Sequence, residues 1–199
     1  MADRLKRPLG ARMVHLCVDM QRIFSSRGIW PTPWMERVLP TVVRIAERHP
    51  ERTVFTRFIT PRDADDLPGT WQLYYRKWHQ ATRAELPADL LDLMPELAKF
   101  VPPATVLDKS FYSAFAGTGL DAWLRERQVD GLVVTGSETD VCVLSTVLSA
   151  VDLGWRVIVV ADALASASDE GHDNLLDLYN RRYAEQVETV DSEALLDLW

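Results

Sequence analysis

Three side chains of complementary chemistry stand just beyond short apolar segments of the chain: the carboxylic acid Asp19, the amine Lys109 and the thiol Cys142. Parallel strands present their carboxyl ends at one edge of a sheet, where ligands of open α/β sheets bind. A thiol beside a base and a cation suits covalent catalysis at a carbonyl carbon. Taken singly, the acid could cap the next segment, and the amine could lie on the surface after an edge strand. Together the three groups predict one site.

The thiol of Cys142 ends a polar turn, 136–142, that leads from an expected strand into an expected helix. The partial positive charge of a helix N-terminus favours a thiolate, and unpaired backbone N–H groups in such a turn can bind an oxyanion. The alternative is a small buried cysteine that begins a core helix, with Thr139 or Asp140 as the cap. Position alone leaves both interpretations open.

Six short segments rich in apolar and β-branched residues alternate with helical patterns. The expected strands are Met13–Val18, Thr53–Phe58, 105–107, 131–135, 156–160 and 186–190. The expected helices are 33–48, 119–128, 140–153, 169–183 and 192–199. Near-continuous apolar strands are typical of a sheet covered on both faces, and strand–helix alternation is typical of doubly wound α/β proteins. We therefore predict an α/β fold with a parallel, doubly wound sheet.

The segment 60–103 interrupts this alternation and is longer than the usual connection between strands. It contains Trp71 and Trp78, and a helix is expected over 87–94. One interpretation is a packed extension that buries aromatic side chains against the core or a second subunit. The other is a wall or lid of a binding pocket. With either interpretation, we expect a single domain over 1–199.

The composition restricts the classes of function. The chain has 199 residues, which is enough for one domain with a hydrophobic core. Its net charge of −7 disfavours nucleic acid as a partner, because an acidic surface repels phosphates. No apolar stretch is long enough to predict a transmembrane helix, and the N-terminus does not resemble a secretory signal. The two cysteines cannot form a disulfide framework, so we expect free thiols in a reducing cytoplasm.

Four ordered segments carry a resemblance to a known family: 18–21 (VDMQ), 108–115 (DKSFYSAF), 136–143 (GSETDVCV) and 154–163. Together they resemble the motifs of the isochorismatase-like cysteine hydrolases, from Met13 to about Val190. The resemblance implies a three-layer α/β/α fold with a six-stranded parallel sheet. It also implies that Asp19, Lys109 and Cys142 form a catalytic triad.

The resemblance further implies a cis peptide bond in the turn before the nucleophile, at Ser137–Glu138. The backbone N–H groups of Glu138 and Cys142 would then form an oxyanion hole. The implied reaction is hydrolysis of a C–N bond in a small amide, ureide or N-carbamoyl compound, through a thioester on the cysteine. No cofactor is implied. The relatives are mostly homo-oligomers, so we expect a dimer or tetramer that acts on a small-molecule substrate.

The sequence departs from two branches of the family. The nicotinamidase branch has a metal site after the second strand, where this chain has TRFIT at 56–60. The four histidines here are His15, His49, His79 and His172. They show no ligand spacing, so no metal is expected and nicotinamide is disfavoured. True isochorismatases cleave a vinyl ether and typically lack the nucleophilic cysteine, so Cys142 favours an amidase over that alternative. The retained triad argues against the other alternative, a non-catalytic binding protein.

The candidate substrate-binding residues are Phe24, Trp30, Arg57, Trp71, Trp78 and Phe115. Arg57 could pair with a substrate carboxylate, as in an N-carbamoyl amino acid, or form a surface salt bridge with the acidic residues of 63–66. The aromatic residues could line a pocket or only pack in the core. Cys17 is expected to be a core residue, because burial in the middle of a strand raises the pKa of a thiol.

Overall fold

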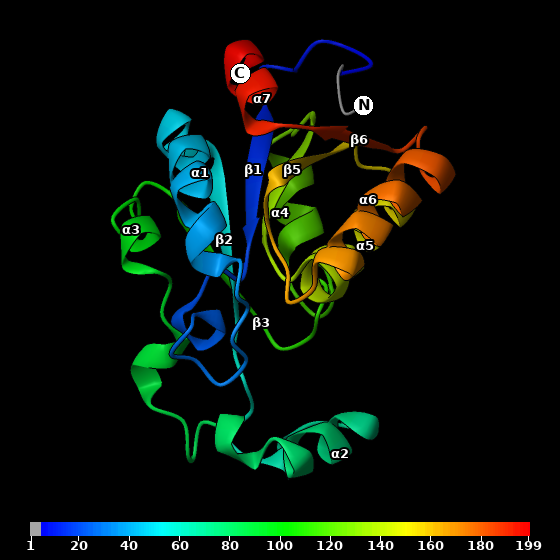
Figure 1. Ribbon diagram of the computed structural model, residues 1–199. Helices are drawn as coiled ribbons and strands as arrows, with labels where there is room; N and C mark the ends of the chain where they lie inside the picture. Colours follow the sequence, from blue (N-terminus) through cyan, green and yellow to red (C-terminus); the bar gives the residue numbers. More distant parts are fainter. Residues whose placement is uncertain (1–4) are drawn as a thin grey trace.

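The structure, a computed structural model, describes residues 5–199, and its centre is a six-stranded parallel sheet (Figure 1). The strands are β1 (Met13–Val18), β2 (Thr53–Phe58), β3 (Thr105–Lys109), β4 (Gly131–Ser137), β5 (Val157–Ala165) and β6 (Val187–Val190). Their order across the sheet is β3-β2-β1-β4-β5-β6. The chain therefore winds outward from β1 to β3 and then returns to the other side of β1. This reversal places a topological switch point between β1 and β4, at whose carboxyl ends ligands bind in open α/β sheets.

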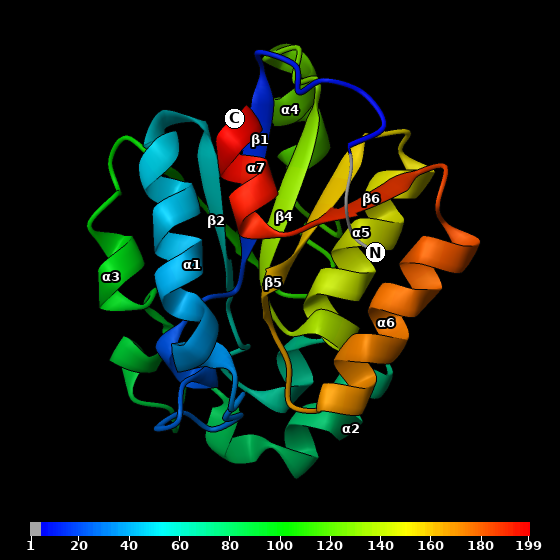
Figure 2. The ribbon, with the colours of Figure 1, turned by 45° about the horizontal axis from the view of Figure 1, so that its top comes forward.

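Helices cover both faces of the sheet (Figure 2). One face carries α1 (Met35–Arg48), α3 (Pro95–Ala98) and α7 (Ser192–Leu198). The other carries α4 (Leu120–Glu126), α5 (Leu144–Asp152) and α6 (Asp169–Arg182). The predicted three-layer α/β/α fold with a six-stranded parallel sheet is confirmed. Among residues 5–199, none of the helices combines the length and the apolar character that crossing a bilayer requires.

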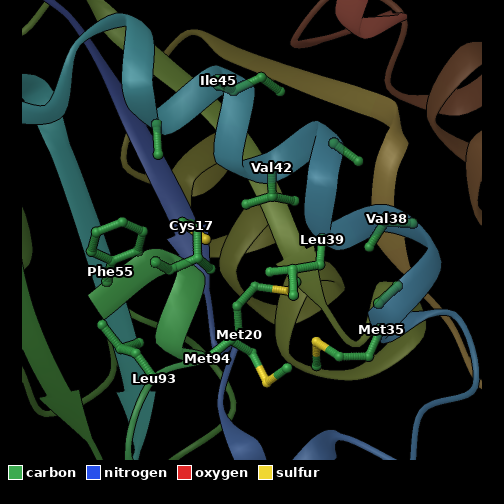
Figure 3. Packing of buried hydrophobic residues seen from close by; sticks show 14 of the residues in the cluster. Cys17, Met20, Met35, Val38, Leu39, Val42, Ile45, Phe55, Leu93 and Met94 are labelled. Carbon is green, nitrogen blue, oxygen red and sulfur yellow. The ribbon is translucent and has the colours of Figure 1, made fainter. Parts of the chain in front are cut away.

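The core between the sheet and α1 is rich in sulfur-containing side chains (Figure 3). Helical spacing turns Val38, Val42 and Ile45 of α1 toward the sheet, where all three are buried. Cys17 of β1 lies in this core with Met20, and both are fully buried. Burial raises the pKa of the Cys17 thiol to about 12, so the thiol stays protonated at neutral pH. The prediction that Cys17 is a core residue is confirmed.

The insertion 60–103 crosses the edge of the sheet at the carboxyl ends of the strands. Its helix α2 (Thr70–Lys77) lies beyond that edge, away from the C-terminus (Figure 1), and the sequence pattern predicts no helix there. The helix expected over 87–94 is reduced to a single 3₁₀ turn, Ala88–Leu91. The residues after that turn pair instead with the chain that follows β1. The N–H of Met94 donates to the carbonyl of Met20 at 2.9 Å.

Strands β1 and β4 approach each other closely at Gly136. The φ angle of Gly136 is +111°, and a Cβ there would lie 2.0 Å from the carbonyl oxygen of Val18. We expect Gly136→Ala to lower the free energy of unfolding by about 2–4 kcal/mol, because alanine would meet both the contact and backbone strain. Chemical denaturation measures this change.

A second glycine provides the control for that variant. Gly154 also has a positive φ, +81°, but no atom lies within 4 Å of a Cβ built there. Gly154→Ala therefore meets backbone strain alone and is expected to cost about 1 kcal/mol. If Gly136→Ala and Gly154→Ala lost equal unfolding free energy, the contact with β1 would not be what excludes a side chain at position 136.

Candidate active site

A buried ion pair lies at the carboxyl ends of the central strands. Asp19 directly follows β1, with a positive φ of 48°, and Lys109 is the last residue of β3. Lys109 Nζ lies 2.6 Å from Asp19 Oδ2, and neither side chain is exposed to solvent. Because β2 separates β1 from β3 in the sheet, the lysine reaches across a strand to its partner. The structure thus brings together two of the three groups that the sequence predicts to form one site.

Thr56 of β2 orients the carboxylate. Its hydroxyl donates to Asp19 Oδ1 at 2.5 Å and accepts the backbone N–H of Asp19 at 3.1 Å. Each carboxylate oxygen therefore has its own partner, Thr56 or Lys109. Lys109 also donates to the carbonyl oxygen of Phe111 at 3.0 Å, and its Nζ lies 5.0 Å from the ring centroid of Phe58. Sequence analysis missed Thr56, for which the available signal was a polar residue within an apolar strand.

Cys142 sits beside this ion pair, in a π-helical turn, Thr139–Val143, that leads into α5. Cys142 is 5% exposed. Burial raises the pKa of its thiol well above the ordinary value, the negative charge of Asp19 raises it further, and Lys109 opposes both effects. For Lys109, burial lowers the pKa, but the charges of Asp19 and Cys142 outweigh burial and the pKa is raised. The raised pKa values of Cys142 and Lys109 favour a protonated thiol and a protonated amine beside Asp19.

The turn before Cys142 has an unusual backbone. The peptide bond between Ser137 and Glu138 is cis, at the position that the family resemblance implies. The carbonyl oxygen of Glu138 accepts the N–H groups of Val141 and Val143, each at 3.1 Å. The bond to Val143 spans five residues, so the backbone is wider here than in an α-helix. Burial raises the pKa of the Glu138 carboxyl, and its Oε1 accepts the N–H of Ala167 at 3.2 Å.

A cluster of aromatic side chains borders the ion pair, and we call it the aromatic cluster. Its members are Phe24, Trp30, Phe58, Trp71, Tyr74, Tyr75, Trp78, Phe111 and Tyr112. Phe58, which contacts Lys109, lies 6.2 Å from Trp30 and 6.4 Å from Tyr112 between ring centroids. Trp71 of α2 lies 4.9 Å from Tyr112. The insertion 60–103 thus contributes aromatic side chains to the edge of the sheet that holds the ion pair.

Comparison with known proteins identifies the family. A family model described as Isochorismatase domain matches residues 13–191, which is most of the chain. The chain belongs to the isochorismatase family. Its curated relatives include the N-carbamoylsarcosine amidase of Arthrobacter sp, 30% identical over 192 residues that cover 92% of this chain and 70% of the relative.

Two further comparisons relate this isochorismatase-family chain to known proteins. The uncharacterized isochorismatase family protein PncA of Bacillus subtilis is 46% identical over 71 residues, which are 36% of this chain and 39% of that protein. The crystal structure of N-carbamoylsarcosine amidase from Thermoplasma acidophilum matches with a TM-score of 0.74 at 25% identity. That match covers 92% of this chain and 97% of the other. The fold is therefore shared with solved members of the isochorismatase family.

Four of the six candidate substrate-binding residues belong to the aromatic cluster: Phe24, Trp30, Trp71 and Trp78. Phe115 packs instead against the core on the other face of the sheet, the face that α5 covers. Sequence analysis missed Phe58, Tyr74 and Tyr112, although the last lies in a family motif. Their place in the cluster depends on how the insertion 60–103 packs, which local sequence does not reveal.

Arg57, which the sequence predicts to bind a substrate carboxylate, does not face this site and is paired with Asp108 instead. Successive side chains of a strand point to opposite faces, so Arg57 points away from the face of Thr56. Its guanidinium pairs with both oxygens of Asp108, at 2.7 and 2.8 Å, and lies 3.9 Å from Asp92. These partners also differ from the alternative salt bridge expected with the acidic residues of 63–66.

The histidines occupy separate places in this isochorismatase-family fold. His15 lies between the hydroxyls of Thr53 and Thr135, and burial lowers its pKa to about 3. His172 contacts the hydroxyl of Thr139 at 3.3 Å. Over residues 5–199, no group of three or more histidine, cysteine, aspartate and glutamate side chains is placed to hold a metal ion.

Proposed function

We propose that this isochorismatase-family hydrolase cleaves the C–N bond of a small amide, ureide or N-carbamoyl compound through a thioester on Cys142. The observation that carries the proposal is the buried pair of Asp19 and Lys109, 2.6 Å apart, that acts on the thiol. The amidase relatives support the same reaction class. The reaction uses side chains and backbone N–H groups of this chain and requires no cofactor.

The first half of the reaction forms the thioester. Asp19 takes the proton of the Cys142 thiol, and the sulfur attacks the carbonyl carbon. The backbone N–H groups of Glu138 and Cys142 hold the oxyanion that develops. The protonated Asp19 then gives its proton to the nitrogen of the leaving amine or ammonia, and the C–N bond breaks. Lys109 balances the charge of the carboxylate and fixes its position, while Thr56 holds the second oxygen.

The second half returns the enzyme to its starting state. Asp19 accepts a proton from water, and the resulting hydroxide oxygen attacks the thioester carbon. The carbon–sulfur bond breaks, and the proton passes from Asp19 to the Cys142 sulfur. The products are a carboxylic or carbamic acid and the free thiol. One water molecule is consumed for each amine or ammonia released, so atoms and charge balance.

Two other functions are considered, a vinyl-ether hydrolase and a non-catalytic binding protein on the same fold. A vinyl-ether hydrolase needs no thiol beside its acid, so the Asp19–Lys109–Cys142 arrangement favours the amidase. A buried charge pair costs desolvation energy and is weak evidence for a purely stabilising role, so its place beside Cys142 favours catalysis over binding alone. Cleavage of a vinyl ether, or the absence of turnover with every amide, would favour these alternatives.

An ammonia-release screen over amides, ureides and N-carbamoyl compounds tests the proposal. We expect release of ammonia together with a covalent adduct whose mass equals the substrate minus ammonia. Acid quenching and peptide mass spectrometry should place the adduct on Cys142 and leave Cys17 unmodified, since the latter is fully buried. Ammonia release at the wild-type rate by a variant that lacks Cys142 would contradict the proposal.

The thiol chemistry also bears on the compartment in which the enzyme works. Both cysteines are free, and the reaction requires Cys142 as a thiol, so we propose a reducing compartment such as the cytoplasm. We further propose that residues 1–199 act as one domain with the insertion 60–103 beside the site. The family resemblance leads us to expect two or four copies of the chain in the working enzyme.

A further inference from the structure

The positive charge beside the proposed nucleophile, on Lys109, already has partners within the protein. Lys109 is buried, lies 2.6 Å from Asp19 Oδ2 and donates to the carbonyl of Phe111 at 3.0 Å. The other nearby candidate, Arg57, is bound to Asp108 and points to the opposite face of β2. Each of these two cations therefore already has a carboxylate partner, Asp19 for Lys109 and Asp108 for Arg57. A substrate carboxylate would therefore lose its hydration at this site without gaining a partner.

An acidic side chain, Glu138, belongs to the turn that carries Cys142 and acts electrostatically on Tyr74 of α2. The Glu138 carboxylate, held by the N–H of Ala167, raises the pKa of the Tyr74 phenol after the larger effects of burial, Tyr112 and Cys142. Asp140, two residues further along, raises the pKa of Glu138 in turn after the effect of burial. The Glu138 carboxylate is therefore a negative group within electrostatic range of the Tyr74 phenol.

Three half-buried rings of the aromatic cluster present differently oriented faces near this acid. The ring centroids of Trp71 and Tyr112 are 4.9 Å apart with planes inclined by 60°. Those of Trp71 and Tyr74 are 5.6 Å apart with planes inclined by 71°. Several aromatic faces beside a carboxylate form the environment that proteins use to bind quaternary and protonated amines.

We propose that this site selects amides by charge: it favours an amide whose remote group is a quaternary or protonated amine, accepts an uncharged one and rejects one that carries a carboxylate. The cationic group would lie against Trp71, Tyr74 and Tyr112 with Glu138 as its counter-ion, while the amide carbonyl meets Cys142. The selectivity rests on the proposed amide hydrolysis, so its test must separate binding from turnover.

Three small amides that differ in charge provide the test. Betaine amide carries a trimethylammonium group, 3,3-dimethylbutanamide has the same shape without charge, and malonamate carries a carboxylate. We expect kcat/KM for betaine amide to exceed that for 3,3-dimethylbutanamide about tenfold, through cation–π and ionic attraction. Malonamate should fall at least about a hundredfold below the neutral amide, because its carboxylate is buried unpaired.

Variants of the proposed binding groups sharpen the comparison. Glu138→Gln and Tyr74→Leu should each reduce the ratio of betaine amide to neutral amide to about twofold or less. Glutamine keeps an oxygen that can accept the N–H of Ala167, so the turn is preserved. Glu96→Gln is the matched control, since Glu96 is exposed on α3 and loses the same charge. The control should retain the wild-type ratio.

Calorimetric binding of the three amides to the Cys142→Ala variant measures charge preference without turnover. Binding in the order cation, neutral, anion supports the selectivity even if none of the three amides is hydrolysed, an outcome that would count only against the proposed reaction. Equal binding or hydrolysis of malonamate and the neutral amide would overturn the selectivity. So would a betaine amide preference that Glu138→Gln and Tyr74→Leu leave unchanged.

Discussion

Replacing Cys142 by alanine is expected to lower kcat/KM for any amide substrate by at least about 10⁴-fold, because removal of a nucleophile leaves only binding and oxyanion stabilisation. The fold should persist, since Cys142 is a small side chain in the turn that leads into α5. Steady-state ammonia release measures the loss, and the circular dichroism spectrum and melting temperature report on folding.

Cys17→Ala is the matched control for that variant. This variant also removes a buried thiol. The thiol of Cys17, however, lies in β1 and belongs to the core against α1. We expect it to lower the free energy of unfolding by about 1–2 kcal/mol through the cavity it leaves, with kcat/KM within about threefold of wild type. Comparable loss of activity in both variants would count against a nucleophilic role for Cys142.

Lys109→Met is expected to lower the free energy of unfolding by about 3–5 kcal/mol and to reduce activity severely. Methionine fills a similar volume, but it leaves the buried Asp19 carboxylate without its ionic partner, and an unpaired buried charge is costly. Urea denaturation measures the stability and ammonia release the activity.

Neutralising Asp19, the partner of Lys109, shows whether the stability lost in Lys109→Met comes from charge or from packing. The double variant Asp19→Asn with Lys109→Met removes both charges and should regain at least about half of the stability lost in Lys109→Met. It should stay inactive, because asparagine cannot take the proton of Cys142. If the double variant were less stable than Lys109→Met, the loss would not come from the unpaired carboxylate.

The same pair predicts a pH dependence of stability. The pKa of Lys109 is raised in the folded protein, so its stabilising effect is fully present below the unfolded value of about 10.4 and is lost as the pH rises through the folded value. The difference in unfolding free energy between wild type and Lys109→Met should therefore stay constant from neutral pH to about pH 10 and shrink above it.

The sheet was accessible to sequence analysis because buried parallel strands have a strong local pattern. β1 and β2 have the expected limits, and the other strands lie within or just beyond theirs. The main difference is β5, expected over 156–160 and observed to Ala165. Its extension depends on a register shift between Val134 and Gly136 of the neighbouring strand, which is a property of the pair rather than of either sequence.

The insertion 60–103 was predicted less well because its structure depends on long-range packing. Half of the eight residues of α2 are Thr, Trp or Tyr, which have modest helix propensity, and Gly69 precedes the helix with a positive φ of 60°. Its position depends on the burial of Tyr75 and on ring contacts with distant residues, such as those of Trp71 with Tyr112 and of Tyr74 with Trp30.

In the site, the family motifs located Asp19, Lys109 and Cys142, since each residue lies at or beyond the carboxyl end of a strand. The pairing of Arg57 with Asp108 could not be predicted from such motifs. Its partner, Asp108, lies at the facing position of β3, and that pairing requires the register between the two strands. The same register places Phe58 opposite Lys109 and so defines the contact between the ion pair and the aromatic cluster.

The ion pair joins the first strand of the sheet to its edge strand, β3, through residues far apart in the sequence. Such contacts form late, because the entropy of closing long loops must be overcome before they contribute stability. We therefore expect Asp19 and Lys109 to meet after β2 has paired with both β1 and β3. During refolding the recovery of catalysis would mark the end of assembly, and a chain released from the ribosome before β3 has docked would carry its acid without the cation that balances it.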